Sequence, residues 1–112
     1  MSARLSSDVL VSALLHMAER EGGFGTVVAK GDANAGAILI VLAERGRPVQ
    51  LLERLLQAGG HYAWGSPLKA GHNEDELNKF LERRRRFDPD SWVLELDTAS
   101  AERFAAEITA LD

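Results

Sequence analysis

The sequence predicts an α+β protein with an antiparallel sheet of four to five strands and helices packed mainly on one face of the sheet. Two observations lead to this fold class. Short β-rich segments bounded by glycines fill the middle of the chain, and amphipathic helical patterns stand before and after them. The chain of 112 residues, 46% hydrophobic and 27% charged, is expected to form a single domain, 1–112, around one core.

The first half of the chain predicts one helix and two strands. A helix is expected between the capping residue Ser6 and the glycine stop at Gly22, because apolar residues recur there at helical spacing. Residues 24–30 are β-branched in their middle and predict a strand. Residues 31–36 consist of Gly, Asp, Asn and Ala and predict a turn, and the apolar segment 37–43 predicts a central, buried strand.

Residues 49–56 allow two interpretations. Their leucines recur at helical spacing after Pro48, which slightly favours a helix that ends at Gly59. The short glycine-containing link that precedes them also suits a β-hairpin, in which they would be a strand. The aromatic segment 61–64 predicts a short strand in either case.

The last third of the chain predicts a helix, a strand and a helix. Asn73 caps a helix whose first turn is acidic, and Pro89 ends this helix near Asp88. Residues 92–96 alternate in polarity and predict a strand. A final helix begins at Thr98 or Ser100. The predicted order is therefore helix, three or four strands, helix, strand, helix.

Three motifs together resemble a known family. They are Gly-Asp-x-x-x-Gly-Ala at 31–37, Leu-Leu-Glu-Arg at 51–54 and Arg-Arg-Phe-Asp-Pro-Asp-x-Trp-Val at 85–93. In these motifs the chain resembles a family of small, uncharacterised alphaproteobacterial proteins, a domain of unknown function. The resemblance covers residues 4–97 and leaves 98–112 as a variable helical extension. It implies a compact α+β fold with 49–56 as a strand of a meander, and it implies no known activity, cofactor or catalytic residue.

Composition excludes several functions. The net charge of −4 argues against a general nucleic-acid binder, because such binding depends on Lys and Arg that neutralise phosphate. The absence of cysteine excludes disulfides, thiolate metal sites and a cysteine nucleophile. The longest apolar run, 37–43, is far shorter than the roughly 20 residues of a membrane helix. We therefore expect a soluble cytoplasmic protein without a membrane anchor.

The arginine run at 83–86 is the most unusual feature of the sequence. At 100° per residue, Arg84 projects from the middle of an apolar stripe made by Leu77, Phe80, Leu81 and Phe87. We expect the stem of Arg84 to be buried and its guanidinium to meet Asp88 or Asp90, or Glu53 across the sheet. The other arginines of the run are expected to remain in solvent.

No catalytic motif accompanies this run. The three histidines lack metal-ligand spacing, and no Gly-x-Ser-x-Gly elbow occurs, so no catalytic residue, metal or cofactor is assigned. The leading hypothesis is a non-catalytic interaction or regulatory protein that binds an unknown protein partner, or a second copy through an uncovered sheet edge. The candidate binding residues are Arg83, Arg84, Arg85, Arg86, Asp88, Asp90, Trp92, Trp64 and Asp32.

Two alternatives belong to other classes. In a nucleic-acid or anion binder, which is the less favoured reading, the arginines would contact phosphate while Trp or Phe stacks on bases. In a small enzyme, Asp88, Asp90 or His61 would act in a cleft. Asp88-Pro89-Asp90 would also suit a hard cation, but a turn that caps backbone amides explains it better.

Overall fold

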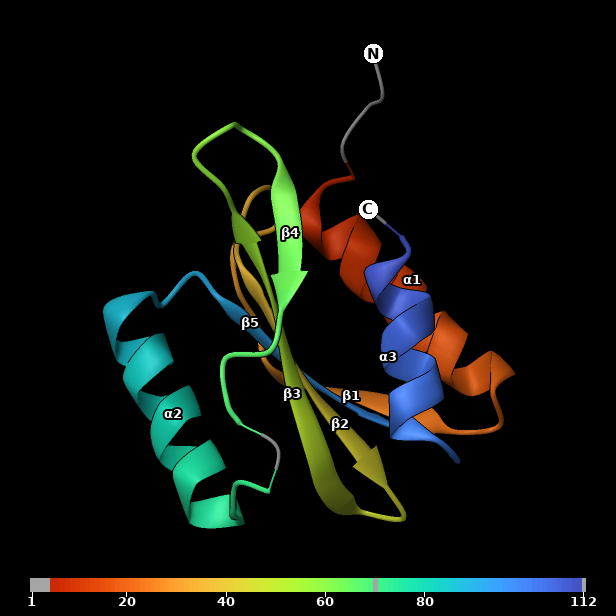
Figure 1. The fold of residues 1–112 in the computed structure, drawn as a ribbon. Coiled ribbons are helices and arrows are strands. Elements are labelled where there is room, and N and C mark those ends of the chain that lie inside the picture. Colours follow the sequence, from red (N-terminus) through yellow and green to blue (C-terminus); the bar gives the residue numbers. More distant parts are fainter. Residues whose placement is uncertain (1–4, 70, 112) are drawn as a thin grey trace.

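In the computed structural model, which describes residues 5–69 and 71–111, the chain forms one five-stranded sheet with helices on both faces (Figure 1). The elements are α1 Ser7–Arg20, β1 Phe24–Ala29, β2 Ile38–Glu44, β3 Arg47–Leu56, β4 Tyr62–Gly65, α2 Glu74–Phe87, β5 Trp92–Asp97 and α3 Ala101–Thr109. Their order matches the predicted order, with four strands between the first two helices. Among the helices of these two ranges, none has the length and apolar character that a membrane crossing requires.

The sheet has the strand order β1-β5-β2-β3-β4. Its pairs are antiparallel except for β2 and β5, which run parallel. The α+β class is confirmed, and the purely antiparallel sheet is wrong at this one pair. The reason is topological: the chain crosses over through α2 and inserts β5 between the first two strands. A parallel neighbour needs such a long crossover connection, which local sequence patterns do not reveal.

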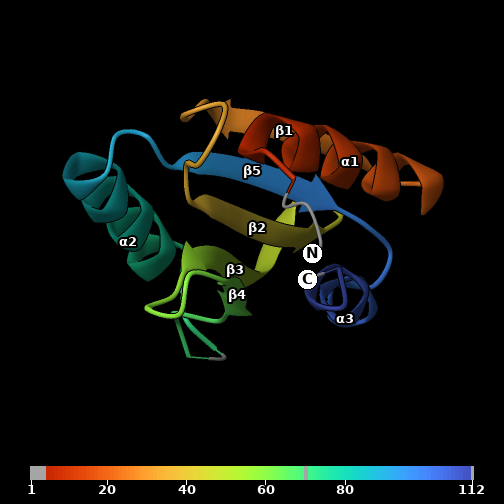
Figure 2. The same cartoon turned by 90° about the horizontal axis from the view of Figure 1, so that it is seen from above.

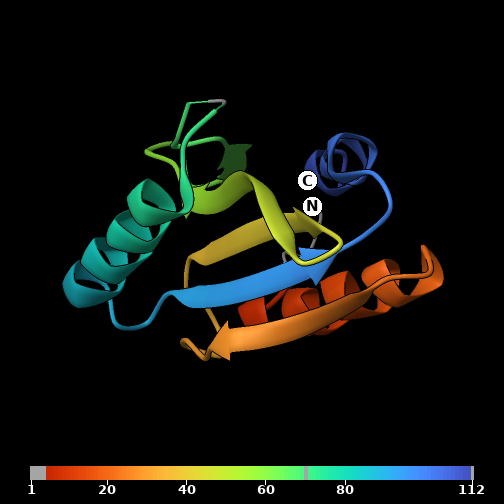
Figure 3. The same cartoon turned by 90° about the horizontal axis from the view of Figure 1, so that it is seen from below.

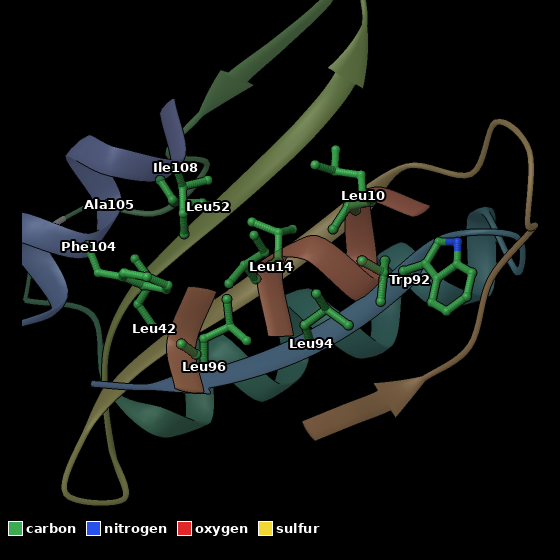
Figure 4. Close-up of a cluster of buried hydrophobic side chains, with 14 of the residues drawn as sticks. Leu10, Leu14, Leu42, Leu52, Trp92, Leu94, Leu96, Phe104, Ala105 and Ile108 are labelled. Atoms are coloured by element: carbon green, nitrogen blue, oxygen red, sulfur yellow. The ribbon is translucent and has the colours of Figure 1, made fainter. Parts of the chain in front are cut away.

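Two of the three helices, α1 and α3, cover one face of the sheet, and α2 covers the other (Figures 2 and 3). The larger cluster of buried side chains lies between the sheet and the helices α1 and α3 (Figure 4). It includes Leu14 from α1, Leu42 and Leu94 from the sheet, and Phe104 and Ile108 from α3. The C-terminal helix therefore contributes directly to the core.

The second, smaller core lies under α2. Leu77 of α2 is buried against Leu39, Val41, Leu51 and Val93, which project from the opposite face of the sheet. Because the central strands are covered on both faces, β2 is apolar at nearly every position, as the sequence predicts for a buried strand.

Residues 49–56 are part of a strand, as the family resemblance implies, and the helical interpretation of their leucines is wrong. The two-residue link before β3 consists of Arg45 and Gly46, both with positive φ (52° and 78°), which is the backbone of a tight hairpin turn. This turn sends β3 back along β2, and the leucines then alternate between faces: Leu51 joins the core under α2, and Leu52 joins the core under α1 and α3.

Glu107 of α3 and Glu21 at the end of α1 form a pair of acids, and their interaction makes the stability depend on pH. A side-chain hydrogen bond with Glu21 raises the pKa of Glu107, and partial desolvation and charge repulsion from Glu21 add to this, against the opposing effect of Arg103 and Arg20. The folded state therefore binds the Glu107 proton more tightly than the unfolded chain does. This stabilisation is present at acid pH and is lost as the pH rises through the raised pKa.

We therefore expect Glu107→Gln to raise the melting temperature slightly at pH 7, since it removes a carboxylate from a like-charged pair. The difference from wild type should vanish at a pH near 3, where Glu107 is protonated and carries no charge. Thermal melts at the two pH values measure the effect. Glu102→Gln, in the first turn of the same helix, is the control and should not stabilise. An increase that is the same at both pH values would contradict the account.

Candidate interaction surface at the end of α2

The helix α2 forms where the sequence predicts it and for the expected reasons. The side chain of Asn73 accepts a hydrogen bond from the amide of Glu76 at 2.8 Å, which caps the first turn. Acidic residues occupy that turn and arginines occupy the last one, so the charges complement the helix dipole. Leu77, Phe80 and Leu81 anchor the helix on the sheet, and Asp88 ends it with non-helical backbone angles.

Arg84 points inward, as predicted, and pairs with a carboxylate. Its partner is Glu53 of β3, with which it forms a salt bridge, and its guanidinium also lies 5.1 Å from the ring centroid of Phe80. The two paired side chains are 25% and 13% exposed, so the pair is shielded but still reached by water. Of the three predicted partners, Glu53 is right and Asp88 and Asp90 are wrong. The Asp88 side chain instead accepts a hydrogen bond from the amide of Asp90 in the loop beyond the helix.

Removal of this pair should cost measurable stability. We expect Arg84→Ala to lower the free energy of unfolding by about 2 kcal/mol, between the values typical of surface pairs and of fully buried pairs. Glu53→Gln should cost less, and a double-mutant cycle in urea should return a coupling of about 1 kcal/mol. A coupling of zero would show that the two side chains do not stabilise each other.

Arg85 has a structural role that the sequence does not reveal. Its Nη1 donates to the carbonyls of Pro89 and Ser91, each at 2.6 Å, and approaches the carbonyl of Lys30 at 3.4 Å. The side chain is half-buried rather than solvated. The expectation that Arg85 stays in solvent is therefore wrong. It fastens the end of α2 to the start of β5 and to the residue that follows β1.

The acidic residues of the predicted site organise backbone turns. Asp88 accepts a hydrogen bond from the amide of Asp90 at 3.2 Å, so this acid-Pro-acid corner caps itself. Asp32 accepts from the amides of Asn34 and Ala35 at 3.1 and 3.0 Å, and its own amide donates to the carbonyl of Asp90 at 2.8 Å. The loop 31–36 is thus a tight turn docked against the corner. These contacts explain the carboxylates of Asp88 and Asp32 without a ligand, whereas Asp90 takes part only through its backbone amide and carbonyl.

Neither tryptophan of the predicted site is an exposed platform. Trp92 is buried in the core under α1 and α3, and its indole N–H donates to the carbonyl of Asp32 at 2.8 Å. Trp64 is half-buried and packs against the same core. Since α2 lies on the opposite face of the sheet, the structure does not bring the two tryptophans and the arginines onto one surface.

Two exposed arginines of the predicted site, Arg83 and Arg86, lie on the outer side of α2 together with Lys79 and Phe87, which the prediction did not include. Lys79, Arg83 and Phe87 follow one another at four-residue spacing and so share a side of the helix. Phe87 is 82% exposed, although the sequence places it on the apolar stripe. It stands at the margin of that stripe in the last turn, beyond the side chains that pack on the sheet. We call Lys79, Arg83, Arg86 and Phe87 the α2 strip.

The charges of the α2 strip are only weakly neutralised. Arg86 lies 3.4 Å from Glu82 and Lys79 lies 4.0 Å from Asp75, and all four side chains are strongly exposed. Such pairs contribute little energy and open easily. Arg83 has no hydrogen bond or ion pair with any residue that the structure describes. A shallow cavity of about 170 Å³ separates these basic side chains.

Sequence reasoning missed the buried arginine of β3, Arg54. It is 2% exposed, and its guanidinium carbon lies 3.9 Å above the ring centroid of Tyr62. The signal that could have found it is strand alternation. Once residues 49–56 form a strand, Arg54 shares a face with Leu52 and must point into the core. Among the described residues, no group of three or more His, Asp or Glu side chains is arranged to hold a metal ion.

The fold and this surface define a small α+β protein with a mixed five-stranded sheet and a basic, aromatic strip on one helix. The profile of the DUF1491 family, described as a protein of unknown function, matches residues 5–106, and the chain belongs to this family. The match includes β5 and most of α3. No curated protein matches the sequence.

Solved structures of related proteins have the same fold. A crystal structure of a DUF1491 family protein from Caulobacter crescentus is 36% identical, with a TM-score of 0.77 over 90% of this chain and 94% of that one. An NMR structure of a DUF1491 protein from the same bacterium gives a TM-score of 0.79. The A. tumefaciens protein Atu0922 is also 36% identical, with a TM-score of 0.74 over 88% and 89% of the two chains.

Proposed function

We propose that this protein is a non-catalytic interaction or regulatory protein that binds an acidic segment of a partner protein through the α2 strip. The observation that carries the proposal is Phe87, a large aromatic side chain that is 82% exposed at the end of a basic helix. Aromatic residues and arginines dominate the binding energy of protein interfaces. An apolar side chain of the partner would cover Phe87, and its carboxylates would pair with Arg83 and Arg86.

The four arginines of the run differ in their contacts, and this difference supports the α2 strip as the binding surface. Arg84 and Arg85 are committed to Glu53 and to backbone carbonyls, so they fix the position of the helix end. Arg83 and Arg86 are exposed beside Phe87 on the fixed end. A binding surface on a rigid element costs little entropy to order when the partner arrives. We place this role in the cytoplasm, since the cysteine-free sequence suits a reducing compartment.

Nucleic-acid binding is the less favoured alternative. Two of the four arginines are already engaged, and the tryptophans that would stack on bases belong to the core. Fluorescence anisotropy with single-stranded RNA and DNA in low salt separates the two functions. Binding that falls steeply with salt would favour the nucleic-acid function and contradict the acidic-protein proposal.

The test of the proposal is a comparison of charge-matched variants. Immobilised wild-type protein should capture a specific partner from a lysate of its bacterium, in which the partner is present at its native concentration. The variant Arg83→Glu/Arg86→Glu should lose that partner, and Phe87→Ala should weaken its capture at least tenfold. The control Arg47→Glu/Lys69→Glu changes the net charge equally at exposed positions outside the strip and should retain the partner. Equal loss in both double variants, or in neither, would refute the α2 strip as the binding site.

A further inference from the structure

One edge of the sheet is open. The strand β1 is hydrogen-bonded to β5 on one side only and ends the strand order of the sheet (Figures 2 and 3). Its sequence, Phe24–Ala29, contains no charged residue and no proline. Three of its apolar side chains are exposed: Phe24 by 59%, Val27 by 40% and Val28 by 59%. Proteins usually protect edge strands with charges, prolines, β-bulges or a covering segment. Of these features β1 has one irregularity in its pairing with β5, between Val27 and Ala29, which leaves the residues before it regularly paired.

The opposite edge differs in ways that make it a poorer pairing surface. The strand β4 has only four residues, Tyr62–Gly65, and its side chains are mostly half-buried. Pro67 follows it within two residues and cannot donate a backbone hydrogen bond. Unpaired main-chain groups beside exposed apolar side chains are therefore concentrated at β1.

We propose that β1 pairs antiparallel with β1 of a second copy of this chain about a two-fold axis, which joins the two sheets into one. Such an interface is self-complementary, as two-fold symmetry demands. Because β1 itself is uncharged, self-pairing places no like charges opposite each other. The exposed side chains of Phe24, Val27 and Val28 would be covered by their counterparts and by the neighbouring backbone.

The charges at the two ends of β1 favour the antiparallel orientation. Glu21 stands just before the strand and Lys30 just after it, and both are exposed. In the register that pairs Phe24 with Val27, antiparallel pairing brings Lys30 of each copy opposite Glu21 of the other, whereas parallel pairing would bring Lys30 beside Lys30. The acidic end is further enriched by Glu107, whose side chain is hydrogen-bonded to Glu21. A lysine from the second copy would neutralise this pair of acids.

The helix α1 would take part in the same interface. It lies over β1, and its Leu15 packs on Gly25, where an added Cβ would lie 2.6 Å from the leucine side chain. Leu15 is half-buried in the single chain. Extension of the sheet beyond β1 would place the two α1 helices beside each other on one face and cover Leu15 further.

Measurement of the oligomeric state tests the proposal directly. Sedimentation velocity and light scattering, from about 1 μM to about 1 mM, should show a dimer that dissociates on dilution. Phe24→Lys/Val28→Lys should weaken the dimer at least tenfold, because lysines on an edge strand oppose pairing. Leu56→Lys replaces an equally exposed residue of β3 and should leave the dimer intact. Circular dichroism verifies that each variant is folded.

A charge swap tests the orientation without disturbing the strand. Lys30→Glu and Glu21→Lys should each weaken the dimer several-fold, since each places like charges together. The double variant should restore the wild-type dissociation constant. A wild-type protein that stays monomeric at 1 mM, or a double variant weaker than either single variant, would overturn the proposal.

Discussion

Replacement of Gly31 by alanine is expected to lower the free energy of unfolding by about 3 kcal/mol or more. A Cβ at this position would lie 2.2 Å from the carbonyl oxygen of Asp90 and 2.7 Å from Cδ1 of Trp92. Both neighbours are fixed: one is backbone, and the other is a buried ring held by its hydrogen bond to the carbonyl of Asp32. The loop after β1 could accommodate the methyl group only if it moved away from the start of β5.

The matched control is Gly65→Ala. Gly65 lies in β4, has no atom within 4 Å of its added Cβ and does not have a positive φ. Its substitution should change stability by less than about 0.5 kcal/mol. Urea unfolding of both variants measures the difference. Equal stability of the two would mean that the loop and the start of β5 are not in close contact.

Arg54→Ala is the second substitution with a large expected effect, a loss of about 3 kcal/mol or more. It removes the largest fully buried side chain of the described structure, together with its stacking on Tyr62. The groups that Arg54 contacts would lose a buried partner, and a cavity would remain. Arg54→Met keeps most of the volume without the charge, so it should recover at least about 1 kcal/mol relative to alanine. A loss below 1 kcal/mol for alanine would contradict the packing.

The local chemistry of α2 shows what sequence reasoning can predict. Its cap at Asn73, its acidic first turn and the inward direction of Arg84 all follow from residue spacing along a single helix. The choice of partner does not. Glu53 lies 31 residues away in the chain and is brought close only by the sheet. Local patterns favour partners near in sequence, such as Asp88 and Asp90, and do not show which residue of the sheet lies beside the helix.

The errors have a common physical cause, which is that tertiary contacts override local pattern. The leucines of β3 have helical spacing, but a two-residue turn and pairing with β2 on one side and β4 on the other make them a strand. The residue pattern alone leaves helix and strand open here, so it does not reveal the inward position of Arg54. The sequence predicts Arg85 in solvent, but its side chain donates to carbonyls of the turn after α2, and a sequence does not show where carbonyls point.

Phe87 illustrates the opposite case. Its hydrophobic character and helical position both predict burial, yet it is 82% exposed, because it lies at the margin of the apolar stripe, away from Leu77, Phe80 and Leu81, which pack on the sheet. A large apolar side chain left in solvent on a well-capped helix is a feature of interaction surfaces more than of folding. The α2 strip can therefore be identified only from the structure, in which Arg84 and Arg85 are engaged and Arg83 and Arg86 are exposed.

The separation of the arginine run into two structural and two exposed side chains is tested most directly by urea unfolding of its four alanine variants. Arg84→Ala should lose about 2 kcal/mol and Arg85→Ala about 1–2 kcal/mol, since each leaves buried or half-buried acceptors without a donor. Arg83→Ala and Arg86→Ala should each stay within about 0.5 kcal/mol of wild type. Four equal losses, or greater losses at Arg83 and Arg86, would contradict the assignment.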